Sequence, residues 1–158
     1  MNVPEEKRAE LFHKFEVFDG LTAEEIDQVA ECAELLELET GEELMTEGAR
    51  NRDLFGLIAG RVEVLKSGDS GEPRKITELQ PHAAFGELGL AVGAPRSATI
   101  RTLEPSEFLH VDGDGFHHLQ TGHTSAAYKV EHNILRILAR RLASMNRELL
   151  QVSEDAID

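Results

Sequence analysis

Residues 86–99 of the chain read Gly-Glu-Leu-Gly-Leu-Ala-Val-Gly-Ala-Pro-Arg-Ser-Ala-Thr, and no other stretch says more about the fold. An acid, Glu87, and a guanidinium, Arg96, stand nine positions apart around a short apolar loop. An ionised carboxylate accepts hydrogen bonds from hydroxyl groups, and the planar fork of arginine matches the oxygens of a phosphate. The loop therefore indicates a site for a small molecule with a hydroxyl and a negative charge, such as a ribose bearing a phosphate.

The other residues of this stretch favour the same interpretation. Gly86 and Gly89 have no Cβ, so the backbone there can come close to a ligand. Residues 87–91 are expected to form one short helical turn, whose first N–H groups have no helical partner and suit an anion. Ser97 adds a hydroxyl, and residues 98–100 read as the start of a strand. The alternative is a surface ion pair, which is favoured for the acid and the arginine alone but not for the whole arrangement.

Short strands broken by turns are expected from Leu35 to Val111. The clearest strands are residues 44–45, 54–58, 61–66, 75–79, 97–103 and 107–111. Ala59-Gly60 reads as a tight hairpin turn between two of them. Many short antiparallel strands in one block predict a sandwich or a jelly roll.

Helical patterns flank this block on both sides. Residues 4–15 read as one helix, and a second begins near Leu21, where Thr22-Ala23-Glu24-Glu25 fits a capping box. From Tyr128 to Val152 the chain returns to a helix. Its apolar residues alternate in steps of three and four, which is typical of a coiled-coil seam. The residues of this seam are Leu135, Leu138, Leu142, Met145, Leu149 and Val152.

The same helix carries a second apolar stripe, formed by Val130, Ile134 and Ile137. A helix with two apolar faces needs two partners. We therefore expect one face to pack on the β-structure and the other on a symmetry mate, which makes the protein a homodimer. The alternative is a single broad stripe that faces the core.

The run Phe85-Gly-Glu-Leu-Gly-Leu, followed by Pro95-Arg-Ser-Ala-Thr, resembles the phosphate-binding cassette of the cyclic-nucleotide-binding domain family. That family includes catabolite activator proteins and protein kinase A regulatory subunits. The resemblance covers roughly residues 15–150. Outside the cassette it is carried by Gly41, Leu44, Glu47-Gly48, Asp53-Leu54-Phe55, Leu57, Gly60, Val62, Val64, Phe108 and Phe116.

The resemblance implies a mainly β fold with flanking helices, an antiparallel jelly roll between N-terminal helices and a long C-terminal helix. Residues 1–34 would be the N-terminal helical segment, and residues 35–123 the β-roll, with the cassette at 85–99. Residues 124–152 would form the dimerisation helix and residues 153–158 an acidic tail.

It also implies roles for single residues. The acid corresponding to Glu87 binds the ribose 2′-OH in the family, and the arginine corresponding to Arg96 binds the cyclic phosphate. Backbone N–H groups near Leu88, Gly89 and Ala98 would complete the anion cradle. The expected nucleotide-binding residues are Gly86, Glu87, Leu88, Gly89, Arg96, Ser97, Ala98, Val64, Ile76, Met145 and Asn146.

The sequence says less about which nucleotide base is bound than about the phosphate and the ribose. Ser97 stands where cAMP-binding activators carry a hydroxyl and where threonine is typical of cGMP-preferring domains, so it does not settle the base. We expect cAMP slightly in preference to cGMP. Catabolite activators place two hydroxyl residues near the adenine, and this chain has Met145 and Asn146 there instead. The adenine contact therefore departs from the family pattern.

Composition limits the compartment and the partners. The net charge is −14, from 30 acids against 16 bases, which repels nucleic acid over most of the surface. No run of about 18 apolar residues and no secretory signal is present, so no membrane partner is expected. Cys32, the single cysteine, reads as a small core residue within a helix. These features indicate a reducing cytoplasm.

We therefore expect a regulatory sensor rather than an enzyme, with cAMP or cGMP as its ligand, no metal and an unknown effector protein. Activator-type relatives continue into a helix-turn-helix domain, whereas this sequence ends at Asp158, so we expect no direct control of transcription. The alternatives are an interaction module that no longer binds nucleotide, or a fragment of an activator-type regulator.

A metalloenzyme on a jelly roll is a further alternative, because His117, His118 and His123 lie close together in sequence. No matching cysteine or acid spacing accompanies them, and an exposed helix or loop is the favoured reading. One face of the C-terminal helix is basic and is expected to be solvated, with nearby acids as partners. Its residues are Arg136, Arg140, Arg141 and Arg147.

Overall fold

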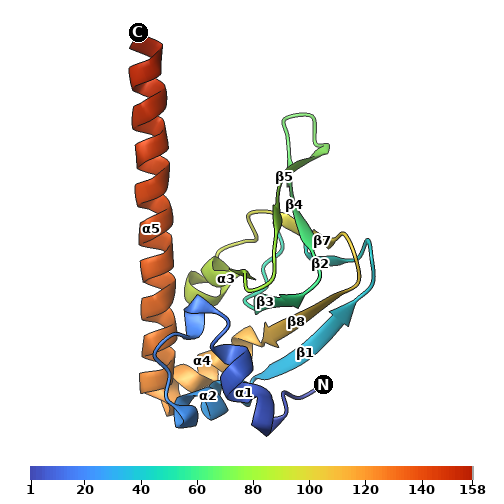
Figure 1. Cartoon of the computed structure of the whole chain (residues 1–158), viewed down its shortest axis with the longest axis vertical. Helices are drawn as coiled ribbons and strands as arrows, with labels where there is room; N and C mark the ends of the chain where they lie inside the picture. The colour runs from blue at the N-terminus through green and yellow to red at the C-terminus, as the bar shows by residue number, and fades with distance from the viewer. Residues whose placement is uncertain (158) are drawn as a thin grey trace.

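The computed structural model describes residues 1–157, except for the side chains of Thr124, Ala156 and Ile157. Two four-stranded antiparallel sheets form a jelly roll, with strand orders β1-β8-β3-β6 and β2-β7-β4-β5 (Figure 1). The strands are β1 (Ala33–Leu38), β2 (Glu43–Met45), β3 (Leu54–Ala59), β4 (Val62–Ser67), β5 (Pro73–Leu79), β6 (Ala84–Phe85), β7 (Thr99–Thr102) and β8 (Ser106–Val111). The predicted fold class is confirmed.

The turn at Ala59-Gly60 differs from its prediction. A hairpin there is wrong, because β3 pairs with β6 and β8, whereas β4 pairs with β5 and β7. The turn instead carries the chain from one sheet to the other. Gly60 has φ +104°, and a Cβ at this position would lie 2.2 Å from Ser106 Oγ, so only glycine fits. The hairpin of this region joins β4 to β5 through residues 68–72.

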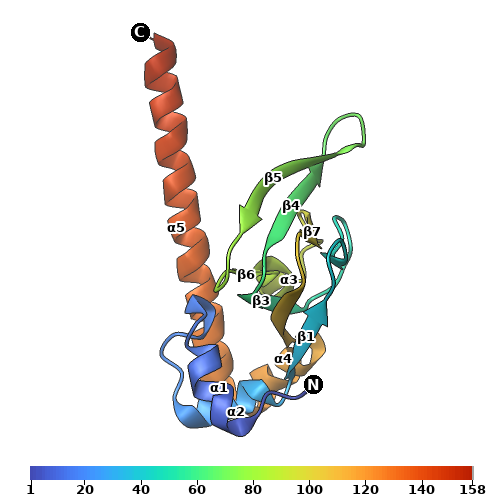
Figure 2. The same cartoon turned by 45° about the vertical axis from the view of Figure 1, so that its right-hand side comes forward.

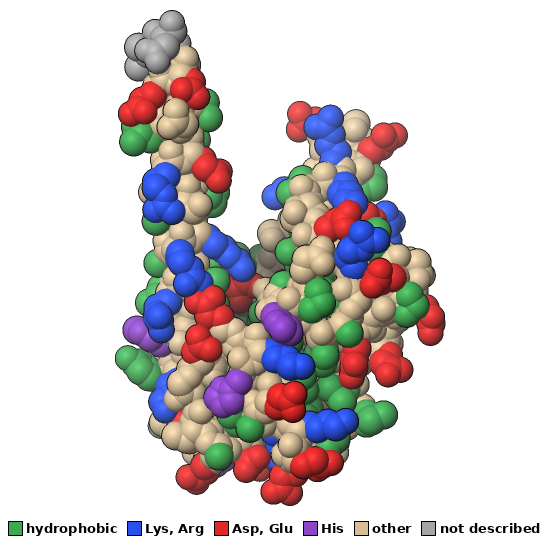
Figure 3. Space-filling model, in the orientation of Figure 1, with side chains coloured by type: hydrophobic (Ala, Val, Ile, Leu, Met, Phe, Trp, Pro, Cys, Tyr) green, Lys and Arg blue, Asp and Glu red, His purple; other side chains and the backbone are tan. Residues whose placement is uncertain are grey.

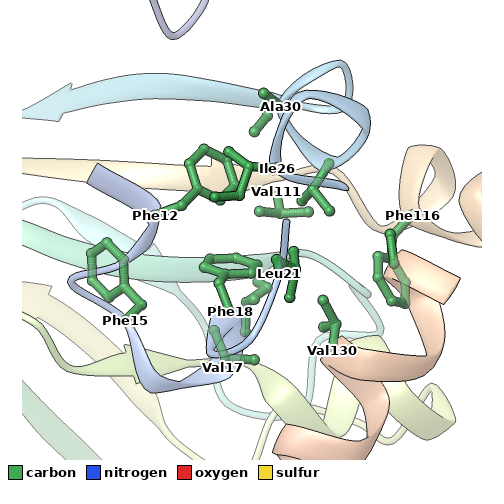
Figure 4. Packing of buried hydrophobic residues seen from close by; sticks show 14 of the residues in the cluster. Phe12, Phe15, Val17, Phe18, Leu21, Ile26, Ala30, Val111, Phe116 and Val130 are labelled. Carbon is green, nitrogen blue, oxygen red and sulfur yellow. The ribbon is translucent and has the colours of Figure 1, made fainter. Parts of the chain in front are cut away.

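Helices cover one end of the roll (Figure 2). The helical elements of the chain are α1 (Glu5–Phe12), the 3₁₀ turn η1 (Glu16–Phe18), α2 (Ala23–Ala30), α3 (Glu87–Val92), α4 (Gly113–Gly122) and α5 (Thr124–Ile157), of which α1, α2 and α4 lie at this end. The single helix expected over 4–15 ends at Phe12, because Phe15 adopts an extended conformation before η1. This break directs Phe12, Phe15 and Phe18 into one apolar cluster (Figure 4).

That cluster is the larger of two cores. It joins α1, η1, α2, α4 and α5 to the neighbouring sheet, and the rings of Phe12 and Phe18 lie 4.8 Å apart. The smaller core lies inside the roll, around Leu57, Ile100 and Phe108. Burial of such side chains stabilises the fold by roughly 1.5–3 kcal/mol each. Leu90 of α3 belongs to the larger core, and Phe85, just before α3, belongs to the smaller one. The two cores together therefore hold α3 in place.

Cys32 lies in the turn after α2 and not within a helix, which corrects the prediction. It is half-buried, and its thiol donates to Val29 O at 3.2 Å. Burial, together with the charge of Asp112, raises the pKa of this thiol to about 11. The thiolate, which is the reactive form of cysteine, is therefore disfavoured. No described helix has the length and apolar character needed to cross a membrane.

The predicted capping box at the start of α2 is confirmed, and Glu25 extends it into a contact between helices. Glu25 Oε1 accepts hydrogen bonds from Thr22 N at 2.9 Å and from Lys129 Nζ at 2.6 Å. Its Oε2 accepts one from Ser125 Oγ at 2.8 Å. The side chain thus ties the start of α2 to the first turns of α5.

We expect Glu25→Gln to lower the free energy of unfolding by about 1–3 kcal/mol at neutral pH. The hydrogen bond from Lys129, then that from Thr22, lowers the pKa of Glu25 from 4.5 to about 2. Because the pKa is lower in the folded protein, this contribution is complete above about pH 4.5 and is lost as the pH falls through about 2.

Urea unfolding of both proteins at several pH values measures this effect. The difference between the two proteins should stay constant above about pH 5 and shrink toward pH 2. A difference that is undiminished at low pH would contradict the role given to Glu25.

The two apolar faces of α5 have different surroundings. Val130 and Ile134 are at most 1% exposed and join the larger core. Leu142 and Leu149 are 59% and 67% exposed. Toward its C-terminus, α5 extends away from the body (Figure 1). The helix continues to Ile157, so most of residues 153–158 is helical. The broad single stripe is therefore wrong. Of the seam residues, Leu138 packs against the larger core, whereas Leu135, Leu142, Met145, Leu149 and Val152 are exposed.

Candidate functional site

Arg96 lies between α3 and β7 and is 4% exposed. Its Nη2 donates to Asp53 O at 2.6 Å and to Asn51 Oδ1 at 3.0 Å, and its Nη1 donates to Gly86 O at 3.2 Å. Its Nε is buried and has no hydrogen-bond partner among the described residues. Burial lowers the pKa of this guanidinium, while the charges of Asp53 and Glu87 raise it. An anion at this point would pair both the charge and the free donor.

The loop beneath Arg96 is held in place through Asp53. Asp53 Oδ1 accepts from Gly113 N at 2.8 Å, and Asp53 Oδ2 lies 2.8 Å from His110 Nε2. His110 Nδ1 lies 3.0 Å from Glu34 Oε1, and the imidazole stacks on Phe55 at 4.9 Å. The oxygens that orient Arg96 therefore belong to a network that spans three strands.

Gly86 and Gly89 also make room for Arg96. A Cβ on Gly86 would lie 2.8 Å from Arg96 Nη1 and 2.6 Å from Asp53 O. A Cβ on Gly89 would lie 2.6 Å from Arg96 Nη1 and 2.7 Å from Asn51 O. The space that glycine leaves is occupied by the arginine and the loop under it. These glycines therefore allow Arg96 to lie beneath α3.

Two adjoining cavities lie beside α3. The smaller, of about 50 Å³, is lined by Arg96 and by the first turn of α3, including Leu88 and Gly89. The larger, of about 490 Å³, extends between β4, β5, η1 and α5. Figure 3 shows the surface hollowed between the projecting α5 and the β4–β5 hairpin. The residues that border both cavities are Met45, Gly86, Glu87 and Ser97.

Glu87 joins the cassette to α5. Its side chain is 12% exposed, and its Oε1 accepts a hydrogen bond from Arg141 Nη1 on α5. The adjacent Arg140 pairs with Glu16 of η1 at 2.6 Å. An ionised carboxylate has about four lone-pair positions, so Glu87 can still accept from a hydroxyl. Glu87 thus lines the cavity and contacts α5 through the same carboxylate.

The structure brings most of the predicted site residues together. Those that line one or both cavities are Val64, Gly86, Glu87, Leu88, Gly89, Arg96, Ser97 and Ala98. Ile76, Met145 and Asn146 line neither cavity. Ile76 is 61% exposed on β5, and Met145 is 58% exposed on the projecting part of α5. Asn146, next in the chain, is also exposed.

Further residues of the larger cavity escaped sequence reasoning, among them Glu16, His82, Ile137 and Arg141. The place of Arg141 could have been predicted from helical spacing. Arg141 follows Ile134 by seven positions and Ile137 by four, so it continues the stripe that faces the body. As expected for the basic face, Arg141 is more than half exposed and pairs with an acid, Glu87, but it also lines the larger cavity.

The histidine cluster lies elsewhere. His117 and His118 are exposed on α4, and His123 caps its end. Within residues 1–157, no three His, Cys, Asp or Glu side chains are placed to hold a metal ion.

A family model and individual sequence relatives both match this chain. The family model described as "Cyclic nucleotide-binding domain" matches residues 35–123, which is more than half of the chain. The chain is 34% identical over 98 residues to a cAMP-dependent protein kinase regulatory subunit of Mycosarcoma maydis. The match covers 60% of this chain and 18% of that protein.

Solved structures agree with these matches. The catabolite activator protein of Thermus thermophilus is 27% identical, with a TM-score of 0.73 over 87% of this chain and 63% of that one. A cyclic nucleotide-binding domain from Methylobacillus flagellatus shares the fold, with 23% identity and a TM-score of 0.77 over 93% of this chain and 83% of that one. The chain thus spans less than two thirds of the kinase subunit and of the Thermus protein.

Proposed function

Since this chain belongs to the cyclic nucleotide-binding domain family, we propose that it is a regulatory sensor whose ligand, cAMP slightly in preference to cGMP, occupies the cavities beside α3. The observation that carries the proposal is the state of Arg96, a buried cation whose Nε has no partner and whose guanidinium borders the smaller cavity. A cyclic phosphate there would supply the missing acceptor and a compensating charge. Relatives whose names include cAMP support this choice, namely a cAMP-dependent protein kinase regulatory subunit and a cyclic AMP receptor protein.

The rest of the nucleotide has suitable surroundings. Glu87 borders both cavities, so its carboxylate can accept from the ribose 2′-OH while the phosphate lies near Arg96. The walls beyond it are apolar on the side of the roll, where Val64 and Leu79 lie. Such a surface suits the face of a purine. Ser97 offers a hydroxyl near the phosphate.

The signal would leave the site through α5. Arg141 holds Glu87 in the structure described here, and Arg140 holds Glu16, so two neighbouring arginines fasten the helix beside the cavity. A ribose hydroxyl on Glu87 changes the partners of that carboxylate and hence of Arg141. Because a ligand shifts a conformational equilibrium only through its different affinity for the two states, this shared carboxylate is the point where occupancy can alter α5.

We further propose that α5 pairs with a second copy of the chain. Its exposed seam repeats every seven residues at Leu135, Leu142 and Leu149, with Met145 and Val152 between and beyond them. Knobs-into-holes packing of two such helices would cover this seam. The sensor would then report occupancy to an effector protein through a dimeric helix pair.

Calorimetric titration with cAMP and, separately, with cGMP tests the proposed function. We expect a dissociation constant of micromolar or tighter for at least one of them, corresponding to about −8 kcal/mol or better. Adenosine serves as the control, because it has the base and the ribose but no phosphate, and its binding should be much weaker. If neither cyclic nucleotide binds, the fold acts as an interaction module and the proposal fails.

A further inference from the structure

The turn between β5 and β6 contains a residue in an unusual backbone conformation. Ala83 N donates to Gln80 O at 3.2 Å, Pro81 is the second residue of the turn, and His82, the third, has φ +81°. Proline followed by a positive φ defines a type II turn, in which glycine is the usual third residue. Within residues 1–157, His82 is the one non-glycine residue with a positive φ.

The surroundings of His82 hold it in this conformation. Its N–H donates to Leu57 O at 2.8 Å, and Leu57 N–H donates to Ala83 O at 2.9 Å, so the turn is attached to β3 on both sides. The imidazole lies edge-on to the ring of Phe15, with the centroids 6.4 Å apart and the planes at 85°. The backbone at His82 is therefore fixed against β3, whereas the His82 side chain is exposed.

His82 differs from the charged side chains that line the larger cavity. Glu16, Glu87 and Arg141 are each in an ion pair. No partner for the ring nitrogens of His82 occurs among the hydrogen bonds of the described residues. The imidazole is thus the uncommitted titratable group on this wall. A backbone conformation that disfavours most side chains, found at a ligand cavity, points to a role for the side chain itself.

We propose that His82 is a ligand-contact residue that adds a positive charge to the cavity when it is protonated. The inference rests on the proposed function, because it requires an anionic cyclic nucleotide in the cavity. Imidazole is the side chain whose charge changes near neutral pH. The affinity for the nucleotide should therefore rise as the pH falls from about 7.8 to about 5.8.

Other charged groups lie near this wall, and we expect none of them to make the nucleotide affinity depend on pH in this range. Carboxylates such as Glu16 and Glu87, and guanidinium groups such as Arg140 and Arg141, do not ordinarily titrate in this range. A cyclic phosphodiester keeps its single negative charge throughout. His110 is the second histidine to consider, because it contacts Asp53, whose carbonyl oxygen orients Arg96. A pH dependence from His110 would persist when His82 is replaced.

The test compares the unchanged protein with His82→Asn and His82→Gly. Both replacements suit a positive φ, and neither titrates, so both variants should fold. Calorimetric titration with cAMP and cGMP at about pH 7.8 and about pH 5.8 measures the affinities. We expect the unchanged protein to bind about three- to ten-fold more tightly at the lower pH. Both variants should bind equally at the two pH values.

The outcomes separate this inference from the proposed function. Nucleotide binding by the unchanged protein, without any pH dependence, would overturn the role of His82 and leave the proposed function in place. A pH dependence that survives in both variants would assign the effect to another group, His110 first, and would also overturn it. Absence of nucleotide binding at either pH would overturn both.

Discussion

Replacement of Arg96 by alanine is expected to weaken cyclic nucleotide binding by at least about 100-fold, whichever of the two nucleotides binds better. Hydrogen bonds to charged groups contribute about 1.5–3 kcal/mol each, and a phosphate facing this guanidinium would make two of them. Each 1.4 kcal/mol corresponds to about a tenfold change in affinity. Calorimetric titration of the variant measures the loss directly.

The same replacement also has a structural cost. Arg96 donates to Gly86 O, Asn51 Oδ1 and Asp53 O, and each of these part-buried acceptors loses one hydrogen bond in the variant. We expect the free energy of unfolding to fall by about 1–3 kcal/mol. Arg96→Lys keeps the charge but not the planar fork, so it should fold better than the alanine variant and still bind weakly.

A matched control is available on β7. Arg101 pairs with Glu63 at 2.7 Å and lines neither cavity, so Arg101→Ala removes an arginine and an ion pair without touching the site. Its affinity should stay within about twofold of the unchanged protein. A cooperatively folded Arg96→Ala protein with undiminished affinity would exclude Arg96 as the phosphate-binding residue.

Replacement of Leu142 and Leu149 together by glutamate is expected to convert a dimer into a monomer. Both side chains are more than half exposed, one heptad apart, on the part of α5 that leaves the body. In the proposed dimer, each would be buried, with roughly 1.5–3 kcal/mol of stabilisation per side chain. Four leucines would be lost per dimer and four like charges introduced, so the dissociation constant should rise at least about a thousand-fold.

Sedimentation equilibrium at micromolar concentrations checks this prediction. The control variant carries Ser144→Glu and Gln151→Glu, which adds two acidic residues per chain at the same spacing but outside the seam, and it should remain dimeric. The fold of each chain should be unaffected, because neither leucine belongs to the buried cores. An unchanged protein that sediments as a monomer at tens of micromolar would exclude pairing through α5.

The sequence predicted best those features that depend on the spacing of residues within a short segment. The capping box at Thr22 and the short helix opening at Glu87 were predicted from spacing and are present. The jelly roll followed from the many short strands, and the family resemblance pointed to the same fold. The roles of Glu87 and Arg96 toward a nucleotide stay predictions, although the structure places both beside one pair of cavities.

Predictions failed where the outcome depended on residues far away in the chain. Ala59-Gly60 looked like a hairpin because its turn residues are those of a hairpin, yet the flanking strands entered different sheets. Cys32 fitted the helical periodicity, but the helix before it ended at Ala30. Strand β6, with only two residues, is too short to show any periodicity, and its pairing with β3 alone defines it.

The amino-acid sequence by itself determined the kind of fold, the cassette with its acid and arginine, and the two-faced helix, because these depend on spacing and on residue chemistry within short segments. Tertiary structure alone decided that Arg141 meets Glu87 across 54 residues and that His82 faces the same cavity. It also decided that Gly86 and Gly89 make room for Arg96. Such contacts join separate elements, and their geometry follows from how the roll and the helices pack around two cores.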